Sequence, residues 1–230
     1  MKRRTLDVIF SVGGVLLAAL LLVLGVVLHN NEHFAKSYVA DQLSQQQITF
    51  ANADALKAAG TDPAITNSPC LNKYAGLNMT TGKQAECYAN SFIAVHLAAS
   101  AKGGGYAGLT YATLGTPQSA LRTQVAAATK ASTSADPTKD PAVVALNTKL
   151  TAINNLRDTM FKGETLRGLL LTSYGFSVFG DKAQQAATVT FMGFILMLVL
   201  SAAGFVHYFM AARRHAEERS PSAAVTTSHA

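Results

Sequence analysis

Two long apolar runs lie near the two ends of the chain. The first covers residues 8–28, the second covers residues 186–210, and neither contains a formally charged residue. About 20 consecutive apolar residues in a helix are enough to cross the hydrocarbon core of a bilayer. Because lipid offers the backbone no hydrogen-bond partner, each run is expected to be helical. The pattern therefore predicts two transmembrane helices.

A cleaved signal peptide is the alternative for the first run, since basic residues precede it. Its apolar stretch is longer than the about 7–15 residues usual for such peptides, and no A-x-A cleavage site follows it. We therefore predict that the first run is retained as a membrane helix.

The region between the runs, residues 29–185, has helical rather than strand periodicity. Residues 63–82 are rich in Asn, Pro, Gly and Thr, which predicts a loop. Thr81 and Gln84 form a capping-box pattern at the start of the next helix, which is expected to end at 103–105. The apolar face predicted for this helix consists of Ala85, Tyr88, Phe92, Val95 and Ala99.

Two further helices are predicted before the second apolar run. Thr116 suits an N-cap with Pro117 in the first helical position, and the alanine-rich segment after it extends to about Lys130. A polar linker follows over 132–139. Asp140, followed by proline, begins the longest helix of this region. Its predicted core-facing stripe consists of Val143, Leu146, Leu150, Ile153, Leu156 and Met160.

These patterns predict an all-α chain in which two transmembrane helices flank a helical extracytoplasmic domain. The predicted segments are a cytoplasmic N-terminus over 1–7, transmembrane helices over 8–28 and 186–210, an extracytoplasmic domain over 29–185, and a disordered cytoplasmic tail over 211–230.

Basic residues flank both runs on the sides that face the chain ends. Lys2, Arg3 and Arg4 precede the first run, and Arg213 and Arg214 follow the second. Positive charge next to a span stays in the cytoplasm, which predicts a plasma-membrane protein with both termini cytoplasmic. The net charge of +6 forms no basic stripe with interleaved aromatic residues. The bilayer is therefore the expected partner of the basic ends, and nucleic-acid binding is not predicted.

The two cysteines of the chain, Cys70 and Cys87, both fall in the predicted extracytoplasmic region. An even number of cysteines in an oxidising compartment favours a disulfide, and two buried thiols are the alternative. We predict a bridge between Cys70 and Cys87.

Three phrases of the sequence are GKQAECYANSFIAVHL at 82–97, GLTYATLG at 108–115 and GETLRGLLLTSYGF at 163–176. With them the chain resembles a group of actinobacterial two-span membrane proteins of unknown function, whose members often carry an automatic label of aromatic ring-opening dioxygenase. The resemblance implies a membrane location and a helical outer domain, and it supplies no active-site residues.

His29 and His33 stand with Glu32 in the pattern H-x-x-E-H, which is also the pattern of inverted zinc peptidases. They are the candidate metal ligands, and a structural metal or peptidase chemistry are the functions the pattern offers. The pattern lies at the exit of a predicted span, where polar residues are expected, and no second ligand-bearing segment accompanies it. A polar interfacial cap is the favoured interpretation, so we predict no metal, no cofactor and no catalytic residue.

The dioxygenase label can be tested by residue type, because a non-haem iron site needs two histidines and a carboxylate. Besides His29 and His33, the predicted outer region contains only His96, which follows apolar helix positions and is predicted to be a core histidine. His207, inside the second run, is interpreted as an interfacial residue near the cytoplasmic side.

The sequence thus predicts a non-catalytic integral membrane protein whose outer domain contacts another membrane or envelope protein, as an accessory subunit of an envelope complex. A binding or sensing domain for a small or lipidic ligand is the alternative, and a metal-dependent enzyme is the third. The aromatic residues predicted to line a ligand site are Tyr106, Tyr111, Tyr174 and Phe176. Small residues at helical spacing can let each span pack closely on a partner helix, and pairing of the two spans with each other is the favoured interpretation. These residues are Gly13, Gly14, Ala18, Ala19, Ser201, Ala202, Ala203 and Gly204.

Overall fold

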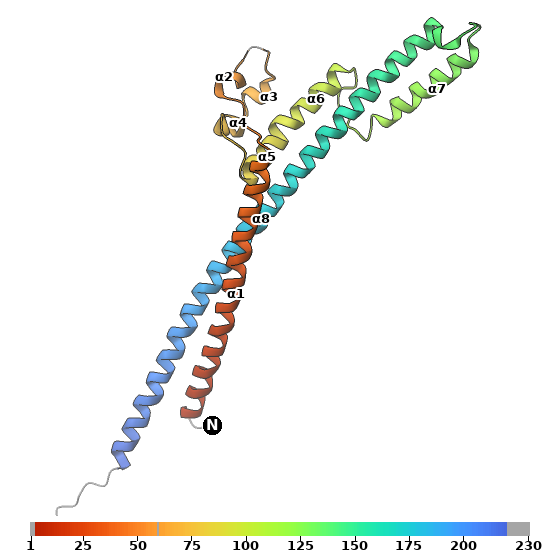
Figure 1. Cartoon of the computed structure of the whole chain (residues 1–230). Helices are drawn as coiled ribbons and strands as arrows, with labels where there is room; N and C mark the ends of the chain where they lie inside the picture. The colour runs from red at the N-terminus through yellow and green to blue at the C-terminus, as the bar shows by residue number, and fades with distance from the viewer. Residues whose placement is uncertain (1–2, 59, 220–230) are drawn as a thin grey trace, which may run out of the picture. The chain divides into compact units, whose positions relative to one another are not determined.

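The structure of the chain, a computed structural model, describes residues 3–58 and 60–219. In this part of the chain the regular secondary structure is helical, and an isolated antiparallel bridge joins Thr49 to Asn78. Two helices, α1 (Arg3–Gln45) and α8 (Pro141–Arg219), contain stretches long and apolar enough to cross a membrane (Figure 1). The predicted all-helical class with two long apolar helices is therefore confirmed for the described residues.

The chain forms two compact units, and each is described by itself. The paired-helix unit consists of Met1–Phe34 together with Phe179–Ala230, and the central unit consists of Ala35–Val178. Both α1 and α8 contribute residues to each unit.

α8 is a single helix, whereas the sequence predicts a helix that starts at Asp140, a separate transmembrane helix over 186–210 and a disordered tail. It runs without a break through residues 161–185, so no change of secondary structure marks the predicted start of the second span at Ala186. Four glycines in that region weaken the helix, but no proline follows Pro141 within α8 to remove a helical hydrogen bond. The helix also continues to Arg219, so the prediction of disorder is wrong for 211–219, and 220–230 lie outside the described residues.

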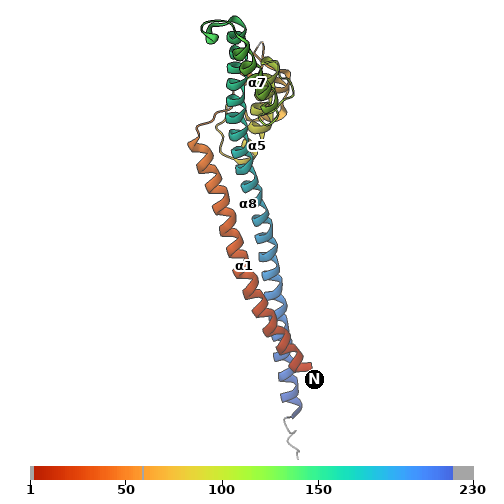
Figure 2. The ribbon, with the colours of Figure 1, turned by 90° about the vertical axis from the view of Figure 1, so that its right-hand side faces the viewer.

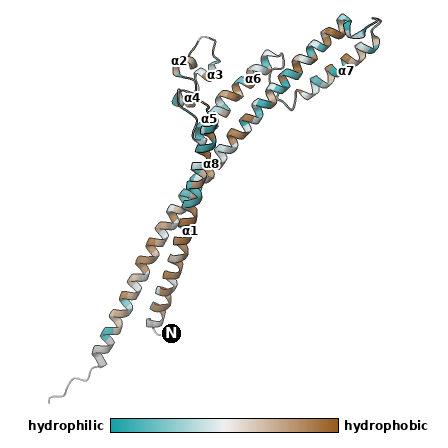
Figure 3. Ribbon diagram, in the orientation of Figure 1, coloured by the Kyte–Doolittle hydropathy of each residue, from teal (hydrophilic) through white to brown (hydrophobic). Residues whose placement is uncertain are grey.

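In the paired-helix unit, the first part of α1 and the last part of α8 run antiparallel, side by side (Figures 1 and 2), and both are predominantly hydrophobic (Figure 3). The residues turned away from solvent repeat every three or four positions, which keeps one stripe of each helix facing its partner as in a left-handed coiled coil. On α1 this stripe is Ser11, Gly14, Ala18, Leu21, Gly25, Leu28 and Glu32. On α8 it is Ala183, Ala187, Thr190, Phe194, Met197, Ser201, Gly204 and Tyr208.

Small residues let the two helices approach closely. A Cβ atom added at Gly14 would collide with the Oγ of Ser201, and one added at Gly25 would lie 2.9 Å from a ring carbon of Phe191. Close packing of this kind holds helices together in lipid, where burial of apolar surface adds no further attraction. The predicted pairing is confirmed at Gly14, Ala18, Ser201 and Gly204, whereas the side chains of Ala19, Ala202 and Ala203 are exposed and a Cβ at Gly13 would meet only open space.

In the central unit, short helical elements connect α1 to α8. They are α2 (Ala53–Leu56), α3 (Pro63–Thr66), α4 (Pro69–Tyr74), α5 (Gly82–Cys87), the π-helix η1 (Tyr88–Ile93), α6 (Ala94–Gly103), α7 (Gly115–Ala131) and the 3₁₀ turn η2 (Pro137–Lys139). The prediction of a loop over 63–82 is therefore wrong for α3 and α4. Asp62 and Ser68 start these two helices by accepting hydrogen bonds from backbone amides, each with a proline in the first turn.

The capping box predicted at Thr81 and Gln84 is confirmed. Thr81 Oγ1 accepts from the backbone amide of Gln84 at 3.3 Å, and Gln84 Oε1 accepts from the backbone amide of Thr81 at 3.0 Å. The helical region that begins there ends at Gly103, as the glycine run predicts, and Gly105 adopts a positive φ of 83°.

The π-helix η1 shifts the buried face of this region away from the predicted one. Five of its buried residues, Ala85, Ala89, Ile93, Leu97 and Ala101, follow one another in steps of four. A π-helix closes its hydrogen bonds at i→i+5, so each turn holds more residues than an α-helical turn, and the predicted alternation of three and four fails. Ala99 is exposed, and Tyr88, Phe92 and Val95 pack only partly buried against the core.

α7 and α8 form a helical hairpin in the central unit. α7 begins at Gly115 with Leu114 at the N-cap position, so the prediction that Thr116 caps this helix is wrong. α8 begins where the sequence predicts, because Asp140 Oδ1 accepts from the backbone amide of Ala142 at 2.9 Å. The predicted stripe of α8 is buried at Val143, Ile153 and Met160 and half-buried at Leu146, Leu150 and Leu156.

Candidate functional site

A cleft between α1 and α8 lies within the central unit and has a volume of about 330 Å³. We call it the α1–α8 cleft. Its lining consists of Tyr38, Val39, Gln42, Leu43, Gln46, Leu166, Leu169, Leu170, Thr172, Ser173 and Phe176. Val39, Leu43 and Leu170 form the floor, since each is at most 4% exposed, whereas Leu169 is 62% exposed. The rings of Tyr38 and Phe176 meet edge to face at 6.2 Å between centroids.

The lining of the α1–α8 cleft is uncharged and more apolar than its residue types suggest. Thr172 Oγ1 donates to the carbonyl of Gly168 at 2.9 Å, and Ser173 Oγ donates to the carbonyl of Leu169 at 3.1 Å. These hydroxyl protons are used within α8 and are not offered to a ligand. Gln42 and Gln46 supply the two side-chain amides of the lining. The chemistry of the cleft therefore suits an uncharged, largely apolar ligand.

A second candidate site is a cluster of two exposed aromatic rings and an arginine beside the α7–α8 hairpin. Tyr111 is 38% exposed and Phe161 is 53% exposed, with 5.5 Å between their ring centroids. The guanidinium of Arg157 lies over the ring of Tyr111, 4.7 Å from its centroid. We call these three residues the Tyr–Arg–Phe cluster.

Arg157 is held in place by neutral partners. It donates through Nη1 to Gln118 Oε1, and Gln118 Nε2 donates to Asn154 Oδ1 at 2.6 Å. Among the residues that the structure describes, no carboxylate oxygen lies within 4.0 Å of its guanidinium, and its buried Nε has no hydrogen-bond partner. The guanidinium of Arg157 therefore carries a positive charge that no carboxylate among the described residues pairs with.

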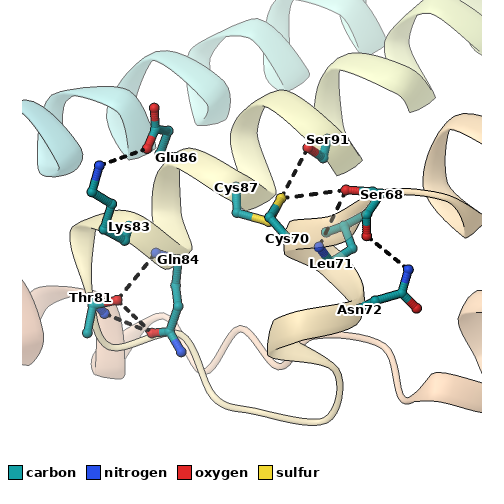
Figure 4. Close-up of a disulfide and its surroundings, with 10 residues drawn as sticks. All are labelled: Ser68, Cys70, Leu71, Asn72, Thr81, Lys83, Gln84, Glu86, Cys87 and Ser91. Atoms are coloured by element: carbon teal, nitrogen blue, oxygen red, sulfur yellow. Dashed lines mark hydrogen bonds and ion pairs between the residues drawn. A yellow bond between two sulfur atoms is a disulfide. The ribbon is translucent and has the colours of Figure 1, made fainter.

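Cys70 and Cys87 form a disulfide with 5.9 Å between their Cα atoms, which is compatible with the sequence prediction (Figure 4). The bridge connects α4 to α5, the helix that begins at the Thr81 capping box. The hydroxyls of Ser68 and Ser91 lie 3.5 Å and 3.3 Å from Cys70 Sγ, and they are the donors because a disulfide sulfur carries no hydrogen. Within the central unit the bridge is a structural tie.

The candidate metal ligands His29 and His33 both lie on α1 and are exposed. Nδ1 of His29 lies 3.3 Å from Oε2 of Glu32, whose side chain is buried. Over 3–58 and 60–219, no group of three His, Cys, Asp or Glu side chains is arranged to hold a metal ion. Within α1, the H-x-x-E-H pattern brings His29 and Glu32 into contact.

His96 and His207 lie in different surroundings. The prediction that His96 is a core histidine is wrong, because its side chain is exposed. Its ring packs edge to face against the ring of Phe92, with 4.3 Å between the ring centroids. The shifted helical face places Leu97 in the core in its stead. In the paired-helix unit, His207 Nδ1 lies 3.1 Å from Asp7 Oδ2, so this histidine has a carboxylate neighbour on the other helix.

The four aromatic residues predicted to line one ligand site lie in four different places. Phe176 lines the α1–α8 cleft, and Tyr111 belongs to the Tyr–Arg–Phe cluster. Tyr174 accepts a hydrogen bond from Lys83 at 3.2 Å, which raises the pKa of this lysine, and Tyr106 packs against the core. Sequence reasoning missed the pairing of Arg157 with Tyr111. The i, i+4 spacing puts Arg157 and Phe161 on one face of α8, but no pattern in the sequence links that face to Tyr111.

No protein-family model, curated protein or solved structure matches the chain. The resemblance to two-span actinobacterial proteins and the dioxygenase label that comes with it therefore stay predictions.

Proposed function

We propose that this chain is a non-catalytic membrane protein whose central unit lies outside the cytoplasm and contacts another envelope protein. The membrane location is supported by the two apolar helices, and the antiparallel contacts of the paired-helix unit place Asp7 and His207 together at one end. α1 begins and α8 ends near that end, which suits two termini on one side of a bilayer. The basic residues in these parts of the two helices, Arg3, Arg4, Arg213 and Arg214, favour the cytoplasm for that end.

The observation that carries the partner contact is the Tyr–Arg–Phe cluster. Tyrosine, phenylalanine and arginine are enriched at the centres of protein interfaces, where they contribute a large share of the binding energy. Arg157 is already ordered by Gln118 and Tyr111, so binding would cost little side-chain entropy at this residue. Because its positive charge has no carboxylate partner among the described residues, the partner is a protein that presents an acidic side chain next to an apolar surface.

Affinity purification in mild detergent tests the proposal. Wild-type protein is expected to retain a partner at a fixed stoichiometry, and Phe161→Ala and Arg157→Gln are each expected to reduce its recovery at least tenfold. Val144→Ala is the matched control, because Val144 is also an exposed apolar residue of α8, at 47%, and lies outside the cluster. Recovery of wild-type chain alone, or equal loss of the partner with Val144→Ala, would contradict the proposal.

A further inference from the structure

We infer that Gln118 sets the charge specificity of the Tyr–Arg–Phe cluster, because it holds the guanidinium of Arg157 by a neutral acceptor and leaves its charge to a carboxylate of the partner. Gln118 acts through Arg157 and is therefore a positioning residue. The inference rests on the proposed protein contact and identifies the residue of this chain that decides which charge the contact accepts.

Gln118 holds an unusual place in α7, which lies alongside the first part of α8 (Figure 1). Within α7, the whole of which the structure describes, Gln118 is the one buried residue, with 7% of its surface exposed. Burial of a side-chain amide costs free energy unless its polar atoms find hydrogen-bond partners. An apolar side chain would avoid this cost, so the packing of α7 on α8 does not by itself require a glutamine here.

Both ends of the Gln118 amide are bonded to residues of α8. Arg157 donates through Nη1 to Gln118 Oε1, and Gln118 Nε2 donates to Asn154 Oδ1 at 2.6 Å. Asn154 and Arg157 are three residues apart and therefore neighbours on the helix surface. The bond to Asn154 fixes the orientation of the amide, because only its oxygen can accept from a guanidinium. Gln118 and the ring of Tyr111 together keep Arg157 in place.

The neutrality of Gln118 keeps the charge of Arg157 available. A glutamate has the same length and would also accept from Nη1, but it would form an ion pair with the guanidinium and cancel its charge. Asp158, which follows Arg157 in the sequence, pairs instead with Lys162, with 2.5 Å between Oδ2 and Nζ. The guanidinium is therefore ordered without being neutralised, which suits a carboxylate that arrives from another protein.

Exchange of the amide for a carboxylate tests the charge specificity. In affinity purification of the full chain from mild detergent, Gln118→Glu is expected to reduce partner recovery at least tenfold, because Arg157 then has an internal counter-charge. The thermal midpoint should not fall, since the hydrogen bond to Arg157 is kept. Asn155→Asp is the control, because it makes the same change on an exposed residue of α8 outside the cluster, and it should retain the partner. Full recovery with Gln118→Glu would overturn the inference.

A second measurement does not need the partner. The side-chain N–H resonances of Arg157 are recorded in arginine-labelled full chain in detergent micelles, while sodium chloride is exchanged for sodium acetate at constant ionic strength. Acetate should shift these resonances in wild type and in Asn155→Asp and should leave them unchanged in Gln118→Glu. The absence of a shift in wild type, or an equal shift in Gln118→Glu, would overturn the inference. The expected shifts from a chain that is purified without any partner would support the role of Gln118 and contradict the proposed protein contact.

Gln118→Met tests the positioning role separately from the charge. Methionine has a similar length but accepts no strong hydrogen bond, so Arg157 keeps its charge and loses its fixed position. Partner recovery is expected to fall about three- to tenfold, which is the effect of ordering one long side chain on binding. Acetate should still shift the Arg157 resonances in this variant. Partner recovery at the wild-type level with Gln118→Met would overturn the positioning role.

Discussion

At the scale of single residues, the contacts between the apolar helices depend on positions that tolerate no side chain. Gly13 and Gly14 are adjacent on α1, yet a Cβ atom at Gly14 would meet Ser201 and one at Gly13 would meet open space. The Oγ of Ser201 is buried without a hydrogen-bond partner among the described residues, so close packing rather than a polar bond stabilises this contact.

Replacement of Gly14 by leucine is expected to force the two helices apart. The Ser201 hydroxyl can rotate away from an added Cβ, but Met197 Cε and Ser201 Cβ lie only 3.5 Å from that Cβ and leave no room for the rest of a leucine side chain. Overpacking of this kind costs about 1–3 kcal/mol. Thermal unfolding in mild detergent should show a lower midpoint for Gly14→Leu and an unchanged midpoint for Gly13→Leu. If both variants unfold at the wild-type temperature, the two helices do not pack through this stripe.

The end of the α7–α8 hairpin is expected to depend on pH through two carboxylates. Hydrogen bonds from Thr138 lower the pKa of Asp136, and a hydrogen bond from Ser132 together with the amide of Ala142 lowers the pKa of Asp140. A carboxylate with a lowered folded-state pKa stabilises the fold above its unfolded value of about 4, and this contribution is lost as the pH falls through the lower, folded-state pKa.

Amide exchange near the start of α8 should therefore accelerate below about pH 4. Asp140→Asn should remove most of this pH dependence, because an asparagine oxygen can still accept from Ala142 but does not titrate. Asp158→Asn, which changes an exposed carboxylate of α8 beyond its first turns, is the control and should leave the exchange at the helix start unaffected. If amide exchange still accelerates at low pH in a variant with both Asp136 and Asp140 replaced by asparagine, other groups cause the pH dependence.

At the scale of elements, sequence patterns predict the helices better than their faces. The capping box at Thr81 and the start of α8 at Asp140 are encoded within a few residues, so they can be predicted from the sequence. The buried face predicted for the helical region after Thr81 is wrong because η1 inserts a wider turn. No residue type is specific enough to predict a π-helix. That shift also explains why His96 is exposed and Leu97 buried.

The disulfide is expected to hold α4 against α5, and its loss should act locally. It closes a loop with a sequence separation of 17, and removal of a bridge of this kind costs about 2–4 kcal/mol. Replacement of both cysteines by serine should increase amide exchange over 63–82 while exchange in α8 stays slow. Counting free thiols in unreduced, denatured wild-type protein provides the direct check, and two reactive thiols would contradict the bridge.

At the scale of the whole molecule, composition predicts the two apolar helices, whereas the candidate sites depend on contacts between distant residues. Phe176 was predicted as a ligand-lining residue, but the opposite wall of the α1–α8 cleft comes from residues 38–46, far away in the sequence. Arg157 meets Gln118 and Tyr111 only after the chain turns back at 132–139. Such long-range pairs leave no periodic signal in one sequence, so the cleft and the cluster could not be predicted from it.

The central claim is that the chain spans a membrane twice, with both ends in the cytoplasm and the central unit outside. Single cysteines at Ser134, which is exposed in the central unit, and at Ser222 test it in a background in which Cys70 and Cys87 are serine. In intact cells an impermeant thiol reagent should label the cysteine at position 134 and should label the one at position 222 only after lysis. Labelling at position 222 but not at 134 in intact cells, or extraction of the chain from membranes by alkaline carbonate, would contradict the account.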